Sequence, residues 1–220
     1  MVKKEIVDVS ESMGAMLFGV LMTIITVSSL SIAGTETEVA ASGIAIAVTV
    51  IAINLGHGII HGYMIIFERG FKRGKILKHA LDIKASDNQQ DAIALLEKDI
   101  NNSAFGDLNS ELKREIALEM HAKLTGLNRP SPLRTRKEDY YAGFFNGLLV
   151  FLVSLLIVLP LLIAPNLQYG VIITGAMGTL CLAILGWFHA KYMFRNRLLT
   201  AAGVTFAGLM IVVITIVLGG

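Results

Sequence analysis

A row of polar side chains inside an apolar stretch has the chemistry to bind a metal ion. Residues 39–67 include two histidines but no Asp, Glu, Lys or Arg. The polar residues in and just after this stretch are Asn54, His57, His61, Met64 and Glu68. Their spacing of three or four residues places them on one face of an α-helix. Imidazole, thioether and carboxylate groups are all metal ligands, so we predict a metal site along this face.

These donors suit Fe²⁺, Mn²⁺ or Zn²⁺ better than Na⁺ or Ca²⁺. Neutral imidazole binds metal and imidazolium does not, so the histidines could also couple metal to protons. The alternative interpretation is hydrogen bonding between helices, with Gly56, Gly58 and Gly62 letting a second helix approach. Ionisable residues are rare inside membranes, and two on one face favour the metal site. Asn146 and His189 are secondary polar candidates.

The elements that carry these residues are membrane spans. With 54% hydrophobic and 16% charged residues, the composition is typical of a membrane protein. Charge-free runs cover residues 12–35, 39–67, 140–190 and 198–220. The third run is long enough for two spans of about 20 residues each, and Pro165-Asn166 can form the turn between them. We therefore predict helices over residues 13–33, 43–67, 142–164, 168–190 and 198–218, the first capped by Ser10 or Ser12.

The basic residues predict the orientation of the chain. All nineteen Lys and Arg residues lie on one side of a five-span arrangement, and the opposite loops, residues 34–41 and 164–168, contain none. Because cytoplasmic loops retain basic residues, the N-terminus should be cytoplasmic and the C-terminus on the far side. We expect an integral membrane protein of the prokaryotic cell (inner) membrane.

A small helical cytosolic domain is predicted between spans two and three. The chain then divides into residues 1–67, 68–139 and 140–220. In the first cytosolic helix, Ser86 and Gln89 would form a capping box. Its apolar face would be Ala92, Ile93, Leu96 and Ile100. The second helix would begin at Ser110 and end at Gly126. Its apolar residues are Leu112, Ile116, Met120 and Leu124.

The carboxylates of the second cytosolic helix, and Glu11 before the first span, each have two possible roles. Glu111, Glu115 and Glu119 recur every fourth residue, a spacing at which like charges repel. They could bind a divalent cation, or they could form a solvated face that Lys123 partly neutralises. Glu11 could interact favourably with the N-terminus of the first span, or it could bind protons or cations at the membrane boundary.

The arrangement resembles the vacuolar iron transporter family and its prokaryotic relatives. The resemblance rests on five spans, a cytosolic N-terminus and a helical carboxylate-bearing domain between spans two and three. It implies a homodimer that moves Fe²⁺ or Mn²⁺ out of the cytosol in exchange for protons. That family uses an acid in the first span and a methionine in the second, to which Glu11 and Met64 are the nearest matches. The family's Gly-Glu-Tyr segment corresponds to His61-Gly62-Tyr63, which lacks the acid.

We therefore predict an all-α integral membrane protein that exports a divalent metal ion, with protons as the coupling ion. Glu11, Asn54, His57, His61 and Met64 would line the pathway, and Glu68 would stand at its entrance. The cytosolic reservoir would be Glu111, Glu115, Glu119 and Met120. The alternative is a non-transporting membrane protein whose cytosolic domain senses metal or binds a protein. No motif indicates an enzyme, an organic cofactor or a nucleic-acid partner.

Overall fold

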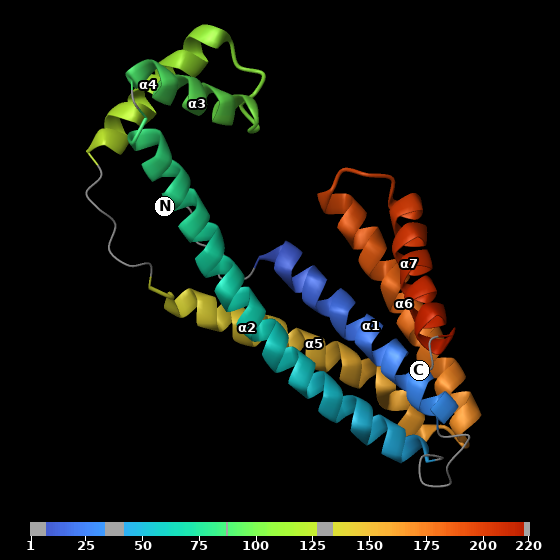
Figure 1. Cartoon of the computed structure of the whole chain (residues 1–220). Coiled ribbons are helices and arrows are strands. Elements are labelled where there is room, and N and C mark those ends of the chain that lie inside the picture. Colours follow the sequence, from blue (N-terminus) through green and yellow to red (C-terminus); the bar gives the residue numbers. More distant parts are fainter. Residues whose placement is uncertain (1–7, 34–41, 87, 127–133, 218–220) are drawn as a thin grey trace. The chain divides into compact units, whose positions relative to one another are not determined.

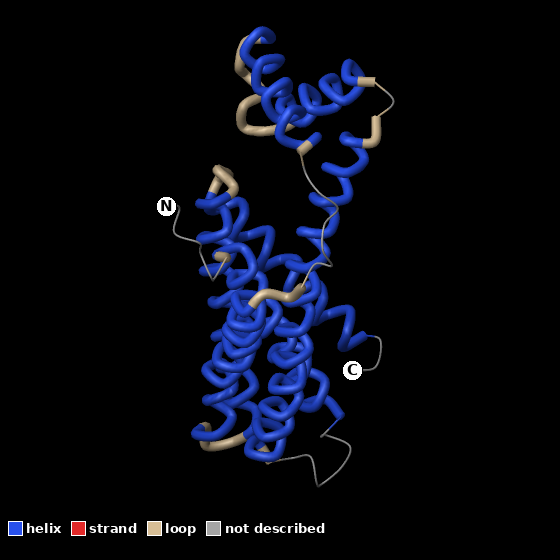
Figure 2. Tube along the Cα trace, turned by 90° about the vertical axis from the view of Figure 1, so that its left-hand side faces the viewer, coloured by secondary structure: helices blue, strands red, loops and turns tan. Residues whose placement is uncertain are grey.

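The computed structural model describes residues 8–33, 42–86, 88–126 and 134–217. Within these ranges the regular structure is α-helical and no strand occurs (Figure 2). The predicted all-α fold is therefore confirmed. The helices in Figure 1 are α1 (Val9–Ala33), α2 (Gly43–Lys84), α3 (Gln89–Asn101), α4 (Ser110–Thr125), α5 (Lys137–Ile163), α6 (Leu167–Tyr192) and α7 (Arg197–Val217).

Five of the described helices are long and apolar enough to cross a membrane, namely α1, α2, α5, α6 and α7. The chain is thus an integral membrane protein with the five spans expected. Several helices extend beyond the predicted ranges, because an apolar run marks only the part of a helix that lies in hydrocarbon. The backbone hydrogen bonds continue into polar residues, so α5 begins at Lys137 and α2 ends only at Lys84.

The chain forms two compact units. Residues 1–66 and 136–220 form one, here called the membrane unit, and residues 67–135 form the other, here called the insertion unit. Helix α2 runs from the first unit into the second. The sequence had placed the divisions after residues 67 and 139, and the structure has them after 66 and 135. The predicted outer loop at 34–41 lies outside the described residues.

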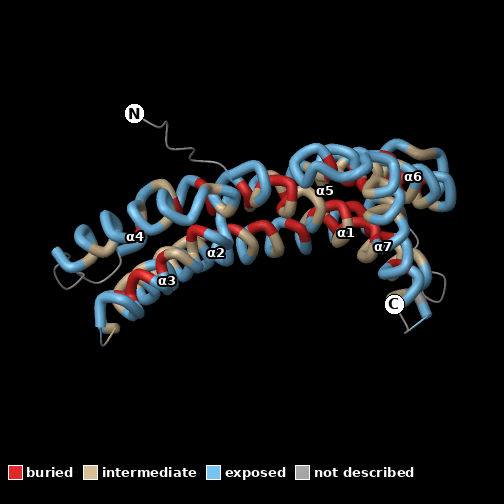
Figure 3. The backbone as a smooth tube through the Cα atoms, turned by 90° about the horizontal axis from the view of Figure 1, so that it is seen from above, coloured by how far each residue is buried: buried red, intermediate tan, exposed pale blue. Residues whose placement is uncertain are grey.

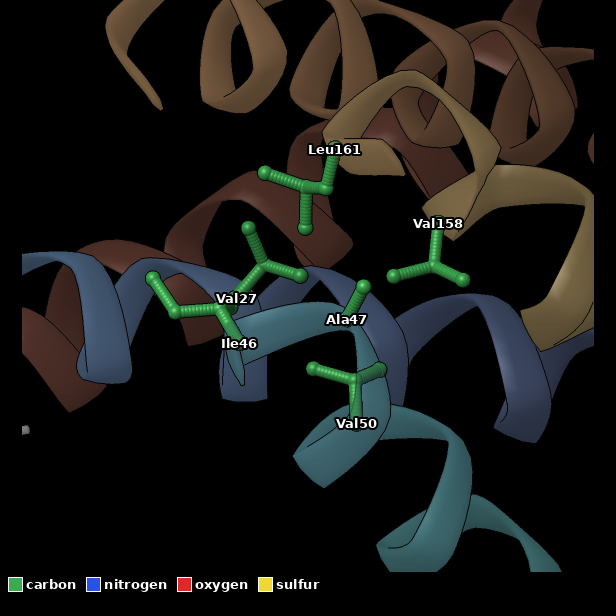
Figure 4. Packing of buried hydrophobic residues seen from close by; sticks show 6 residues of the cluster. All are labelled: Val27, Ile46, Ala47, Val50, Val158 and Leu161. Atoms are coloured by element: carbon green, nitrogen blue, oxygen red, sulfur yellow. The ribbon is translucent and has the colours of Figure 1, made fainter. Parts of the chain in front are cut away.

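The core of the membrane unit is built around α1. One apolar cluster joins α1, α2 and α5, and its side chains point toward one another in Figure 4. It contains Val27, Ile46, Ala47, Val50, Val158 and Leu161. A second cluster joins α1 with α5, α6 and α7 through Val20, Ile24, Ile157, Leu182 and Val212. Buried residues accordingly occur along α1 in Figure 3, and α1 contributes to both clusters.

Two predicted helix caps are wrong. The carboxylate of Asp8, not Ser10 or Ser12, accepts the backbone N–H of Ser10 at 2.7 Å and caps α1. Likewise Asn88 caps α3, where its side chain accepts the N–H of Asp91 at 2.8 Å, so Ser86 does not form the expected capping box. In both cases the capping residue stands directly before the helix, and Asp and Asn cap at least as well as Ser.

The turn predicted at Pro165-Asn166 is confirmed. Helix α5 ends at Ile163 and α6 begins at Leu167. The side chain of Asn166 accepts the backbone N–H of Tyr169 at 3.0 Å and so caps α6. The short connection makes α5 and α6 antiparallel neighbours.

The insertion unit has a core of its own. Ala92, Ile93, Leu96 and Ile100 of α3 are buried, as predicted. They pack with Ile83 at the end of α2 and with Ala117 of α4. The predicted α4 stripe is only partly correct. Ile116 and Leu124 pack against this core, whereas Leu112 and Met120 are about 40% exposed, at 39% and 41%. The small side chain of Ala117 lets α4 approach α3 closely, and the long side chains beside it stay at the surface.

Candidate functional site

The predicted polar row on α2 divides between two environments. Asn54 is fully buried in the membrane unit, and His57 and His61 are partly buried there. Met64 is 60% exposed, so it lies off the face that packs against the other helices. Glu68 belongs to the insertion unit, where its carboxylate forms an ion pair with Lys72 at 2.8 Å. The described packing therefore groups three of the five residues.

The two imidazoles lie against Phe18 of α1. The Phe18 ring stacks on His61 with centroids 5.5 Å apart and meets His57 edge-on at 5.7 Å. The Nδ1 atom of His57 is buried and has no hydrogen-bond partner among the described residues. A buried imidazole nitrogen without a partner is costly, and a neutral one has a lone pair for a metal ion or a proton. Sequence reasoning missed Phe18, because one aromatic residue in an apolar span has no distinctive spacing.

Asn54 and Asn146 make a second polar feature of the same unit. Each side-chain NH₂ donates to a backbone carbonyl one helical turn earlier, Val50 at 2.9 Å and Ala142 at 2.8 Å. Both residues are 0% exposed, and their Oδ1 atoms have no partner in the described part of the chain. These hydrogen bonds orient the amides and leave two carbonyl oxygens in the interior that could accept a proton donor, a water molecule or a cation.

Glycines bring α2 and α5 into backbone contact beside these residues. A Cβ atom added to Gly58 would lie 2.6 Å from the carbonyl oxygen of Gly147, and one on Gly62 would lie 2.6 Å from that of Gly143. This confirms that these two glycines allow a second helix to approach, whereas Gly56 has nothing within 4 Å. The glycines are also among the residues that line an apolar groove of about 460 Å³ between α2 and α5. Tyr63 and Tyr140 are among the residues that line it.

Glu11 lies in the first turn of α1 and is partly buried. Its backbone N–H is 3.4 Å from Oδ1 of the capping Asp8. The position agrees with a carboxylate beside the positive end of a helix dipole. The next residue, Ser12, is 8% exposed, and its hydroxyl oxygen has no partner among the described residues.

The carboxylates of α4 are exposed in the insertion unit. Glu111, Glu115 and Glu119 all lie at the surface, and Met120 is 41% exposed. Glu119 accepts a hydrogen bond from Lys123 at 2.8 Å. That bond, together with the positive charge of Lys123, lowers the pKa of the Glu119 carboxyl group. Glu119 therefore stays ionised to lower pH than an isolated glutamate would.

The predicted ligands do not converge on one point within the described chain. There, no group of three or more His, Cys, Asp or Glu side chains is placed to hold a metal ion. The structure brings His57 and His61 together on Phe18, but no third donor of these types joins them among the residues that the structure describes. A complete coordination sphere would need donors of another kind, such as amide oxygens or water, or residues from a second chain.

Comparison with known proteins gives a match for the later part of the chain, which excludes most of the predicted pathway residues. The model of the VIT family matches residues 65–220, which include the end of α2 and all of α3 to α7. Glu11, Asn54, His57, His61 and Met64 precede the matched residues. A comparison with curated proteins finds no match.

Proposed function

The chain belongs to the VIT family, and from this membership and the site on α2 we propose that it transports a divalent transition-metal ion across the membrane. The family assignment supports metal-ion transport in general terms. The substrate is Fe²⁺, Mn²⁺ or Zn²⁺, because the donors on α2 include imidazole nitrogen. In this proposal the ion is cargo, the protein performs no catalytic step, and no organic cofactor is needed.

The observation that carries the proposal is the His57–His61 pair. Two ionisable side chains one turn apart occur inside a membrane span, and Nδ1 of His57 is buried with no hydrogen-bond partner among the described residues. Burial of such groups is unfavourable unless they bind something or exchange protons. Asn54 lies one turn before His57 and contributes an amide oxygen to the same pathway.

We propose further that the working form is a homodimer. Met64 is 60% exposed, and its neighbours Ile60 and Tyr63 are 59% and 61% exposed. A second copy against this face would bring two thioethers and further donors to the pathway. This accounts for the incomplete ligand set of one chain, because symmetry doubles every donor that lies near the axis.

The distribution of basic residues supports a direction of transport, and the two histidines support proton coupling. We propose that the end carrying the basic residues is cytoplasmic, as the positive-inside rule expects. Glu111, Glu115, Glu119 and Met120 then collect the ion in the cytosol, with Glu68 at the entrance and Glu11 at the membrane boundary. Protons move in the opposite direction because His57 and His61 bind either a proton or the metal.

The test is ion flux in liposomes containing purified protein. We expect uptake of Fe²⁺, Mn²⁺ or Zn²⁺, with a pH-sensitive dye reporting opposite proton movement. The variant His57→Ala with His61→Ala should reduce flux to background. The variant His121→Ala is the matched control, since His121 lies on α4 and should leave the flux of the spans unchanged. Full flux in the double variant would reject the histidine pathway, and no flux of any of the three ions in the wild type would reject transport.

One observation favours a second candidate function. The insertion unit is compact by itself and has its own apolar core, as expected for a module that senses metal or binds a protein without transport. In that case the full-length protein should bind metal at Glu111, Glu115 and Glu119 while the liposomes show no flux. Elemental analysis of the purified protein, compared with flux, separates the two functions.

A further inference from the structure

The connection between α6 and α7 is an exposed hairpin of unusual composition. Every residue from 191 to 199, here called the α6–α7 hairpin, is exposed. It contains three cations, Lys191, Arg195 and Arg197. It also exposes the large apolar side chains of Tyr192, Met193, Phe194, Leu198 and Leu199. Water alone would solvate the cations well but not the apolar side chains.

Phe194 has the most unfavourable position in this hairpin. Its side chain is 98% exposed and its φ angle is 52°, the only positive φ of a non-glycine residue in the described chain. The turn is closed by backbone hydrogen bonds from Met193 to His189 at 3.1 Å and from Arg195 to Ala190 at 3.0 Å. Glycine is the usual residue at such a helix end, because a side chain is strained there. The chain thus holds an aromatic ring outward in a conformation that favours glycine.

The cations of the hairpin have no acidic residue close to them in the sequence on either side. No Asp or Glu occurs after Asp139 in the sequence. Arg195 and Arg197 stand at the N-terminal end of α7, where the helix dipole is positive and favours anions. The guanidinium of Arg197 lies 5.8 Å from the centroid of the Trp187 ring, a contact that positions the cation but does not neutralise it. The hairpin itself thus carries three positive charges and no negative one.

The location of the hairpin identifies the ligand that meets both requirements. Helices α6 and α7 are both long and apolar enough to cross the membrane, so the residues joining them lie at its surface. Phospholipid phosphates and the upper parts of acyl chains occur together at that depth. We propose that the α6–α7 hairpin binds an anionic phospholipid, with Lys191 and Arg195 at the headgroup and Phe194 among the acyl chains. This proposal does not depend on which ion the protein transports.

The single tryptophan of the chain, Trp187, makes the proposal directly measurable. Full-length protein is reconstituted in phosphatidylcholine vesicles that contain a small fraction of brominated phosphatidylglycerol or brominated phosphatidylcholine. Bromine quenches tryptophan fluorescence at short range, so the loss of signal reports which lipid occupies the hairpin. We expect brominated phosphatidylglycerol to quench at a several-fold lower fraction. Equal quenching by the two lipids would overturn the proposal.

Charge removal tests the role of the cations. In Lys191→Gln with Arg195→Gln, the preference for phosphatidylglycerol should fall by about fivefold or more, since one basic residue near an anionic surface contributes about fivefold in affinity. These substitutions leave the Arg197–Trp187 contact in place. The matched control, Arg134→Gln with Lys137→Gln, removes two exposed cations near the start of α5 and should keep the preference. Unchanged preference in the first variant would contradict the assignment.

Phe194→Gly separates lipid binding from a merely structural turn. Glycine relieves the positive φ angle, so the melting temperature should rise or stay the same, whereas quenching by brominated phosphatidylglycerol should weaken. If the turn were only structural, the lipid preference would be unchanged, and the role of Phe194 would be rejected. Added inorganic phosphate should not restore the fluorescence. Full recovery at millimolar phosphate would mean a simple phosphate site and would also reject the lipid assignment.

Discussion

Two rows of polar residues in this protein have nearly the same spacing but opposite surroundings. The row on α2, here called the covered row, is Asn54, His57 and His61. These residues face other helices, and Phe18 covers both imidazoles. The row on α4, here called the exposed row, is Glu111, Glu115 and Glu119. These residues face outward, and Lys123 neutralises part of their charge. Helical spacing places residues on one face but does not say what covers that face. The side chains of the covered row can contact only the few groups that the neighbouring helices place beside them. Those of the exposed row can contact water, many different ions or nearby side chains in turn.

The largest expected effect is a loss of stability when the α2–α5 contact beside the covered row is disrupted. In Gly62→Val, the new Cβ would lie 2.6 Å from the carbonyl oxygen of Gly143, so the helices must separate. We expect a loss of about 1–3 kcal/mol or more in stability, seen as a lower melting temperature in detergent. Gly56→Val is the matched control because nothing lies within 4 Å of that position. Equal melting temperatures would show that the glycine contact does not hold α2 in place.

An intermediate effect is expected when the covered row loses its buried amide. Asn54→Leu removes a buried carbonyl oxygen that has no partner in the described chain. Since such an atom costs about 1–3 kcal/mol, the variant should be as stable as the wild type or more stable, while metal flux falls. Glu115→Gln on the exposed row should change stability by less than about 0.5 kcal/mol. Normal flux combined with strong destabilisation of Asn54→Leu would make Asn54 a structural residue.

The smallest effect concerns the pH response of the exposed row. Lys123 lowers the pKa of Glu119 through a hydrogen bond and its charge, and Glu119 raises the pKa of Lys123. The contribution of Glu119 to stability is therefore present above the ordinary carboxyl pKa and is lost as the pH falls through the lowered value. The contribution of Lys123 is present below its ordinary pKa and is lost as the pH rises through the raised one. Because both groups are exposed, these contributions are small.

The measurement is the carboxyl titration of Glu119 by carbon NMR. In Lys123→Gln the titration midpoint of Glu119 should rise toward that of an ordinary glutamate. A midpoint of Glu119 that does not move would show that the 2.8 Å hydrogen bond to Lys123 does not persist in solution.

The features that depend on the thickness of the membrane or on the local sequence were predicted correctly. Five spans follow from the length of apolar runs, and the turn at Pro165-Asn166 follows from residues that cannot continue a helix. The close approach of a helix to Gly58 and Gly62 also follows from their small size. Helix ends were less predictable. Asp8 and Asn88 cap α1 and α3, but serines close to them in the sequence cap helices about equally well, so the sequence does not show which residue is the cap.

By itself the sequence determined which residues share a helical face, because the period of the helix is the same everywhere. Only the tertiary structure decided which part of a face is covered, because that depends on side chains from other helices. Thus Phe18 covers His57 and His61 but Met64 stays exposed. On α4, Ala117 becomes the buried contact in place of Leu112 and Met120. The periodicity predicted a metal site, but it could not show that no three His, Cys, Asp or Glu side chains come together in the described part of the chain.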